Sequence, residues 1–338
     1  MNKKQQVAVI IGILISVIFL WIAFYDLRPA DVVDNIQQAN IMWLLVGATI
    51  YFLAVTIIAL RWQFLLRAIE YVPLSKLTPL VAIGYMGNNV YPFRSGEALR
   101  IFLLKRNHNI PIVKATTTVI VERVFDGLVM LTFIVVPLSL VDIASEEINT
   151  VAQFAAPIFL SALLIFFILT AKPNVLHNLI KFFSRPLPER IATIIEKIAE
   201  EIIHGLEALR SPSQLAGAII SSYTTWAIEA GVYWIVSFAF DLDITYWVAL
   251  MVVGTVNLAG LIPASPGQVG VFEFFASTVL VAAGIEETLA ASYALTVHIV
   301  IWLPVTLVGF YFLVKQGLGW QAITQARSLG GETQDPTS

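Results

Sequence analysis

The stretch that decides the fold is GYMGNNVYPFRSGEALR, residues 84–100, in which an apolar helical pattern stops at Pro92 and then resumes. Proline removes an amide donor and clashes with the preceding turn, and glycine loosens the backbone. A second stretch, LIPASPGQVGVFEFF at residues 261–275, repeats the interruption at Pro263, 171 residues further along the chain. The sequence therefore predicts two broken or re-entrant helices at matching positions.

The composition is that of a membrane protein. Of 338 residues, 58% are hydrophobic and 13% charged, and the mean hydropathy is +0.82. A soluble domain carries about 25% charged residues, and one spanning helix needs roughly 20 apolar residues. We therefore expect an all-α, polytopic integral membrane protein, with 7–25 retained as a helix and not removed as a signal peptide. The apolar segments are 7–25, 41–60, 78–92, 97–104, 115–140, 152–171, 213–240, 245–262, 268–284 and 288–314.

Basic residues set the predicted topology, because short cytoplasmic loops accumulate Lys and Arg. If the N-terminus is inside and each broken pair enters and leaves on one side, Arg28 is the only basic residue outside. We expect six full crossings with both termini cytoplasmic, in the cell inner membrane. The basic residues assigned to the cytoplasmic side are Lys3, Lys4, Arg61, Arg67, Lys76, Lys105, Arg106, Lys114, Lys172, Lys181, Arg185, Arg190, Lys197, Arg210, Lys315 and Arg327.

This topology predicts two inverted repeats. Each repeat has a helix, a broken pair and a second helix, and the two pairs open to opposite sides. Interrupted segments at matching positions of two halves point to a transporter binding site. The alternative is that Pro and Gly only kink ordinary membrane helices. The predicted organisation is one transmembrane domain at 1–320, with repeat one at 41–140, repeat two at 213–314, an amphipathic cytoplasmic connector at 187–210, and a polar tail at 321–338.

The breaks also supply candidate binding residues. Ser95 is predicted to cap the helix that restarts at Gly96, and Ser265 to begin a capping box for the second restart. Two helix N-termini that point inward bind anions, and Arg94 adds a full positive charge. The substrate-binding candidates at the breaks are Asn88, Asn89, Arg94, Ser95, Gly96, Glu97, Asn257, Ser265 and Gly267.

Charges within apolar segments are the second functional signal. A charge near the bilayer centre costs about 2.5–3.5 kcal/mol, so such residues face a bundle interior or a polar path. Asp126 and Glu273 are expected to border a shared cavity, as counter-charges for a cationic group or as proton carriers. The alternative is that these charges form structural salt bridges. Glu229 is a further charge within an apolar segment that is not among the binding candidates, and His298 is expected to be packed and hydrogen-bonded. The candidates of this kind are Arg100, Glu122, Arg123, Asp126 and Glu273.

At these positions the chain resembles a known family. NNVYPFRSGEALR at 88–100, ERVFD at 122–126 and PASPGQVGVFE at 263–273 resemble the lysylphosphatidylglycerol synthase transmembrane region, also called the flippase-like domain. In the multiple peptide resistance factor this domain is joined to a soluble aminoacyltransferase, and the residues after 315 are too few for one. The resemblance therefore implies lipid translocation and not lipid synthesis.

The leading hypothesis is a flippase that moves an anionic, aminoacylated or polyprenyl-linked lipid between leaflets. The alternatives are an integral-membrane transferase for lipid or isoprenoid phosphates, and an accessory subunit of a lipid-modifying enzyme. The chain has no cysteine, and its histidines form no ligand motif, so we expect no metal, no cofactor and no catalytic residue. The net charge of −3 gives no reason to expect nucleic acid. The partners considered are a membrane lipid, the bilayer, and a second copy of the chain in a homodimer.

Overall fold

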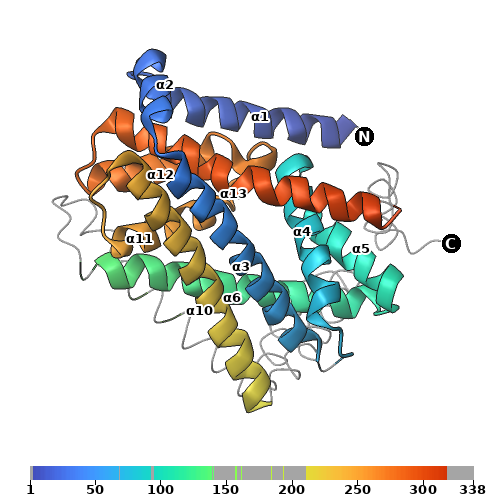
Figure 1. Cartoon of the computed structure of the whole chain (residues 1–338). Helices are drawn as coiled ribbons and strands as arrows, with labels where there is room; N and C mark the ends of the chain where they lie inside the picture. The colour runs from blue at the N-terminus through green and yellow to red at the C-terminus, as the bar shows by residue number, and fades with distance from the viewer. Residues whose placement is uncertain are drawn as a thin grey trace.

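The computed structural model describes residues 3–67, 69–92, 95–138 and 211–317, together with Leu140 and four isolated positions (157, 161, 184 and 193). Within these residues the chain is helical and contains no strand (Figure 1). The predicted segment 152–171 and connector 187–210, apart from those isolated positions, lie outside the described residues, as do the polar tail 321–338 and Arg94.

The described helices follow the predicted apolar segments closely. The one addition is α2, a short helix that Pro29 begins between the predicted segments 7–25 and 41–60. The elements are α1 (Lys3–Phe24), α2 (Pro29–Gln38), α3 (Ile41–Leu66), α4 (Leu74–Val90), α5 (Gly96–His108), α6 (Ile112–Leu138), α10 (Pro212–Ser237), η3 (Phe238–Phe240), α11 (Tyr246–Ala259), η4 (Pro266–Gln268), α12 (Val271–Ala282) and α13 (Glu287–Lys315).

Two of the described helices, α3 and α13, are each long and apolar enough to cross a membrane. The pair formed by Val9–Phe24 and α2 also passes this test, although the two helices are bent by 82° to one another. These spans agree with a membrane protein. The count of six crossings and the orientation stay predictions.

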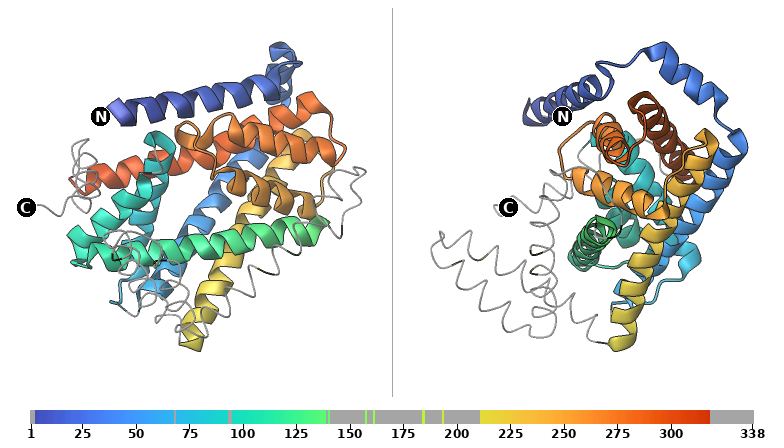
Figure 2. Two further views of the ribbon diagram at one scale, coloured as in Figure 1. Left: turned by 180° about the vertical axis from the view of Figure 1, so that it is seen from behind. Right: turned by 90° about the vertical axis from the view of Figure 1, so that its left-hand side faces the viewer.

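The helices pack in a pattern that is unchanged when the two predicted repeats are exchanged. Helices α3 and α10 lie side by side, α4 packs against α13, and α11 packs against α6 (Figure 1). If α3, α4 and α6 are exchanged with α10, α11 and α13, the same list of contacts results. Helices α4 and α5 lie at one end of the molecule and α11 and α12 at the opposite end (Figures 1 and 2).

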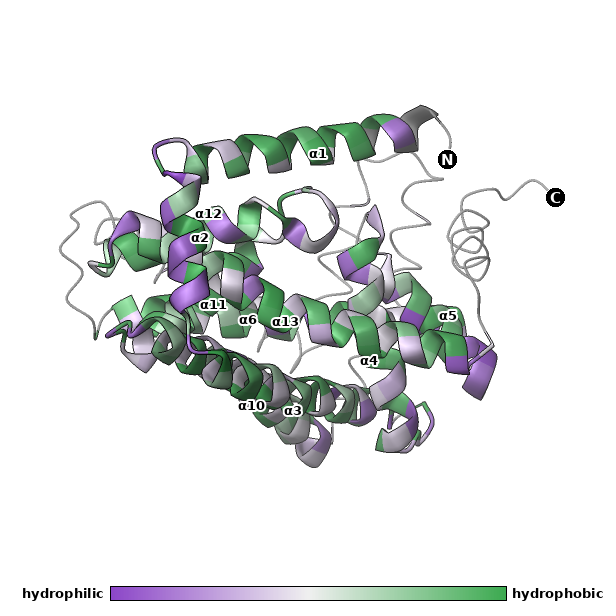
Figure 3. Ribbon diagram, turned by 45° about the horizontal axis from the view of Figure 1, so that its top comes forward, coloured by the Kyte–Doolittle hydropathy of each residue, from purple (hydrophilic) through white to green (hydrophobic). Residues whose placement is uncertain are grey.

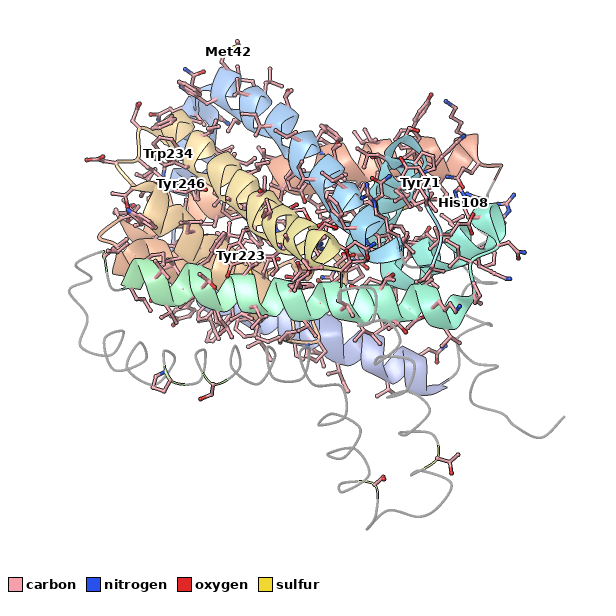
Figure 4. The ribbon with its side chains drawn as sticks, turned by 90° about the horizontal axis from the view of Figure 1, so that it is seen from below. Met42, Tyr71, His108, Tyr223, Trp234 and Tyr246 are labelled. Atoms are coloured by element: carbon pink, nitrogen blue, oxygen red, sulfur yellow. The ribbon has the colours of Figure 1, made fainter. Side chains whose placement is uncertain are left out.

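The two ends of the molecule carry exposed or half-buried aromatic side chains. Tyr71 lies at the end where α3 leads into α4, and Trp234 and Tyr246 lie together at the other end (Figure 4). The rings of Trp234 and Tyr246 meet edge to face with centroids 6.0 Å apart. Aromatic residues with a polar group favour membrane–water interfaces, so this placement suits a membrane-spanning bundle.

The first break is closed by a side chain of the helix that precedes it. Asn88 Oδ1 accepts a hydrogen bond of 3.0 Å from the amide of Gly96, the first residue of α5. The predicted cap by Ser95 is wrong, because its hydroxyl instead donates to the carbonyl of Pro92 at 2.5 Å. Gly96 packs so tightly against the backbone of Gly84 and Asn88 that no Cβ fits there.

The second break is longer than predicted. Gly267 has a φ of +72°, which turns the chain, so that α12 begins only at Val271. The predicted capping box at Ser265 is therefore wrong, and its side chain makes no cap hydrogen bond. The amide of Gly270 donates to Glu273 Oε2 at 2.6 Å and takes the place of that cap.

Helix α1 lies along one face of the molecule and contacts the second break (Figure 2). The amide of Ser265 donates to Ser16 Oγ at 2.9 Å, and Phe19 packs on Phe274 and Phe275 with ring centroids 5.1 and 5.8 Å away. The other faces of α1 are apolar and exposed, as Figure 3 shows by colour. Such a surface suits contact with acyl chains.

Candidate functional site

A cavity of about 460 Å³ lies where the two breaks meet. Its wall contains residues of α1, α3, α4, α5, α6, α10, α11, α12 and α13, and both break loops. The polar and aromatic side chains among its lining are Tyr51, Tyr85, Asn88, Asn89, Glu97, Arg100, Arg123, Trp226, Glu229, Tyr233, Asn257, Ser265, Gln268, Phe272, His298 and Trp302.

The two breaks contact each other directly at this cavity. A Cβ on Gly267 would lie 3.3 Å from the carbonyl oxygen of Asn89 and only 2.6 Å from Trp302 Nε1, so no larger residue fits there without a shift. The Asn89 side chain donates to Thr306 Oγ1 at 2.8 Å and so ties the end of α4 to α13. The two asparagines of the first break therefore hold the backbone of the cavity wall.

A buried ion-pair network stands behind one wall of the cavity. Arg61 of α3 contacts Glu122 at 2.9 Å and Asp126 at 2.5 Å, both on α6. Asp126 Oδ1 also accepts from Trp226 Nε1 at 2.7 Å. One oxygen of each carboxylate, Glu122 Oε1 and Asp126 Oδ1, is thus held by buried protein donors.

Two further arginines, Arg100 and Arg123, pair with the acids of this network and line the cavity. Arg100 pairs with Glu122 at 3.1 Å and lies over the Trp62 ring, 4.5 Å from its centroid. Arg123 contacts Glu97, Glu122 and Asp126 at 3.5, 3.3 and 3.2 Å, yet its side chain keeps 38% of its surface exposed. The three arginines and three carboxylates balance in charge, and Arg123 is their most exposed cation.

Arg61 is buried, which corrects its predicted place in a cytoplasmic loop. Only 1% of the residue is exposed. Helix α3 continues to Leu66, whereas the predicted segment ends at 60, so Arg61 lies within the helix. Its two carboxylate partners compensate the burial of the guanidinium.

Like Asp126, Glu273 does not line the cavity, which corrects the expectation that both residues border it. It lies in the first turn of α12, where Oε2 caps the amide of Gly270 and Oε1 contacts His298 Nδ1 at 2.7 Å. The His298 ring stacks on Phe272 with centroids 4.1 Å apart and does line the cavity. Both oxygens of Glu273 therefore have partners within the fold.

The predicted site residues divide into three groups. Lining the cavity are Asn88, Asn89, Gly96, Glu97, Arg100, Arg123, Asn257, Ser265 and Gly267. Outside its lining are Ser95, Glu122, Asp126 and Glu273, of which the three acids contact lining residues through ion pairs. Arg94 lies outside the described residues. A substrate-binding role for any of them stays a prediction.

Sequence reasoning missed most of the aromatic lining. Tyr51, Tyr85, Tyr233 and Trp302 face the cavity, and the hydroxyl of Tyr233 and Nε1 of Trp302 are buried without a hydrogen-bond partner. Glu229 also lines the cavity and carries a usable signal, since it is an acid in the middle of an apolar helix. Aromatic residues occur throughout the apolar segments, and their sequence positions give no such signal.

Among the residues that the structure describes, no three of His, Asp and Glu gather in a way that would hold a metal ion. The polar lining consists of amide, hydroxyl, indole and guanidinium groups beside two carboxylates and one imidazole. Most of these groups donate hydrogen bonds. The arrangement is therefore suited to a ligand that is rich in acceptor oxygens.

Fold and cavity together define a helical membrane protein with a polar chamber between two broken helices. The chain belongs to the family described as the lysylphosphatidylglycerol synthase TM region, whose model matches residues 9–309. The resemblance of its three motifs to that family is thereby confirmed.

Several archaeal proteins are similar to the chain. It is 26% identical over 322 residues to the glycosyltransferase AglD of Haloferax volcanii, covering 87% of this chain but 51% of AglD. It is 24% identical over 333 residues to a UPF0104 membrane protein of Pyrococcus horikoshii, covering 93% and 98% of the two chains. A UPF0104 membrane protein of Methanothermobacter thermautotrophicus is 24% identical over 318 residues. The chain thus spans about half the length of AglD and nearly all of the Pyrococcus protein.

Proposed function

We propose that this protein moves a lipid with an anionic headgroup between the two leaflets of the membrane. The supporting observation is the cavity of about 460 Å³ that polar side chains of both breaks line inside a helical membrane protein. Pockets for small ligands measure roughly 300–1,000 Å³, so a phosphodiester headgroup fits this volume. A polar chamber in such a setting is costly unless it serves a polar ligand.

Donor groups in the cavity favour an anion. Arg123 presents a partly exposed guanidinium, while Trp302 Nε1 and the Tyr233 hydroxyl are buried without partners. A phosphate oxygen that accepts hydrogen bonds from these groups satisfies donors that otherwise stay unpaired. The contacts between helices stay the same when α3, α4 and α6 are exchanged with α10, α11 and α13. Such a symmetric arrangement suits a chamber that opens alternately to the two sides of the membrane.

Filling the cavity tests the proposal without changing any charge. Ile301 of α13 lines the cavity, and Ile299 of the same helix is 55% exposed on its outer face. In proteoliposomes that contain a lipid with a fluorescent acyl chain and a phosphoglycerol headgroup, Ile301→Trp should slow its movement between leaflets at least tenfold. Ile299→Trp makes the same substitution outside the cavity and should match the wild type.

The outcome is read from quenching of the outer-leaflet fluorophore by a membrane-impermeant reductant, with thermal unfolding as the check on folding. Equal rates in both variants would contradict the proposal, as would a wild-type protein that moves none of the anionic lipids tested.

A second candidate function is transfer of a group to a lipid or isoprenoid phosphate, and the name of AglD, a glycosyltransferase, favours it. A transferase consumes a donor such as a nucleotide sugar in the presence of a polyprenyl phosphate acceptor. Release of nucleoside diphosphate by the purified chain under these conditions would support this function, and lipid movement without donor consumption would exclude it.

A further inference from the structure

One carboxylate of the cavity has no cationic partner among the described residues. Glu229 lies in the middle of α10, lines the cavity and is 4% exposed. Glu97, Glu122 and Asp126 share three arginines, and Glu273 has His298. No arginine, lysine or histidine of the described chain forms an ion pair with Glu229.

The groups that act on the Glu229 carboxylate are neutral or negative, and the cations of the helices packed on α10, Arg61 of α3 and Arg123 of α6, are paired with Asp126. Asn257 of α11 hydrogen-bonds to the Glu229 side chain. Three tyrosines interact electrostatically with the carboxylate: Tyr233, one helical turn further along α10, Tyr51 of α3 and Tyr85 of α4. From α6 the carboxylate of Asp126 acts on it with a like charge. From α13 the titratable groups are Tyr293, whose hydroxyl donates to the carbonyl of Tyr233, and His298, which is paired with Glu273. Helix η3 contributes no titratable side chain.

The charge balance of the cavity therefore depends on Glu229. Among the described residues the arginine network sums to zero, so an ionised Glu229 adds one negative charge that no described cation pairs with. Such a charge is costly within a bilayer. It also repels the anionic headgroup that Arg123 attracts into the same chamber. A proton on Glu229 removes both penalties, and the carboxyl group then becomes a hydrogen-bond donor.

We propose that Glu229 is a proton-binding site and that the cavity takes up a proton together with its anionic lipid headgroup. The inference rests on the proposed function and adds its energy coupling. Glu229 gains a proton from water on one side of the membrane and loses it to water on the other side, so no other reactant is required. Proton and headgroup travel in the same direction, and an inward proton gradient drives inward lipid movement.

The test uses full-length protein in liposomes with a pH-sensitive dye inside and the fluorescent phosphoglycerol lipid in the membrane. An inward proton gradient should accelerate inward movement of the lipid several-fold in the wild type, with acidification of the lumen. Glu229→Gln resembles the protonated carboxyl group and should move lipid at a rate that does not depend on the gradient. Glu287→Gln, the same change at an exposed residue in the first turn of α13, should behave as the wild type.

A second measurement makes the inference independent of transport. Infrared difference spectra of the purified protein, recorded between about pH 5 and pH 8, should contain the carbonyl stretch of a protonated carboxyl group. The band should be absent in Glu229→Gln and return, shifted, in Glu229→Asp. If the band is the same in wild type and Glu229→Gln, the proton site is excluded whether or not lipid moves.

The transport results separate the two proposals. A wild type that moves the lipid equally fast with and without the gradient overturns the proton coupling and leaves lipid movement intact. A Glu229→Gln variant that still responds to the gradient also overturns it. Loss of selectivity for headgroups in this variant, with an unchanged pH response, would identify Glu229 as a site for a substrate ammonium group and would refute the proposal.

Discussion

Asn88 Oδ1 lies 3.0 Å from the amide nitrogen of Gly96, so a side chain at the end of α4 caps the beginning of α5. The cap crosses the break between the two helices and fixes the angle at which they meet. It also satisfies the amide of Gly96, the first residue of α5. The first break is thus held by a contact that the local sequence around Ser95 does not reveal.

Removal of this cap should loosen the break. Loss of a cap side chain costs about 1 kcal/mol, so we expect Asn88→Ala to lower the thermal unfolding temperature and to slow lipid movement. Asn107→Ala is the control, because Asn107 hydrogen-bonds at 3.0 Å between exposed groups. Equal stability of the two variants, measured by thermal unfolding in detergent, would show that the Asn88 contact contributes nothing.

Alanine substitutions at Gly96 and at Gly231 test the tight packing of the first break. A Cβ at this position overlaps the carbonyl oxygen of Gly84 and the amide of Asn88, so Gly96→Ala should prevent α4 and α5 from packing and greatly reduce the yield of folded protein. Gly231 in α10 has nothing within 4 Å of an added Cβ. Gly231→Ala should therefore be neutral, or stabilise the helix by up to about 1 kcal/mol. Size-exclusion chromatography should show a monodisperse peak for Gly231→Ala and little folded protein for Gly96→Ala. Similar profiles for the two variants would refute the tight packing at Gly96.

The ion-pair network should behave as one unit. Asp126→Asn leaves Arg61 with less compensation in a buried site, and Arg61→Met leaves the carboxylate uncompensated. Each single change is expected to cost about 3–5 kcal/mol, and the double variant less than the sum of both. Unfolding free energies of all four proteins provide this double-mutant cycle, and additive costs would contradict the coupling.

The orientation of the molecule is testable by cysteine labelling, since the chain contains no cysteine. Tyr71 is exposed between α3 and α4, at the predicted cytoplasmic side, and Asp243 is exposed between η3 and α11, at the predicted outer side. In intact cells an impermeant thiol reagent should label Asp243→Cys and not Tyr71→Cys. The reverse pattern would overturn the predicted topology.

The helices were predictable because their signals are local. Apolar length, proline and glycine mark each segment, and α4, α5 and α11 lie close to where the sequence places them. The beginning of α12 was not predictable, because the turn at Gly267 lies against the distant Asn89 and Trp302, and the local sequence does not show this packing. Helix α2 is short and amphipathic, and no apolar run between the predicted segments 7–25 and 41–60 marks it.

The candidate site was predictable where a residue type is costly in a membrane. Arg100, Arg123 and the acids of α6 stand out for that reason, and the structure brings them together at the cavity wall. The sequence left open whether these residues form structural salt bridges or a functional site, because helix spacing alone does not show which arginine meets which acid. The tyrosines and Trp302 are common residue types in such segments, and only the packing of distant helices turns them toward the chamber.

Helix α1 is a separate part of the cavity wall. Val9 and Gly12 line the chamber on its inner side, whereas Ile10 and Leu14 on its outer side are more than half exposed. On this side one helix separates the polar chamber from the exposed apolar surface of the molecule. A bound lipid can leave its tails in the bilayer while its headgroup occupies the chamber. We therefore expect the protein to select lipids by headgroup and to accept acyl chains of any length.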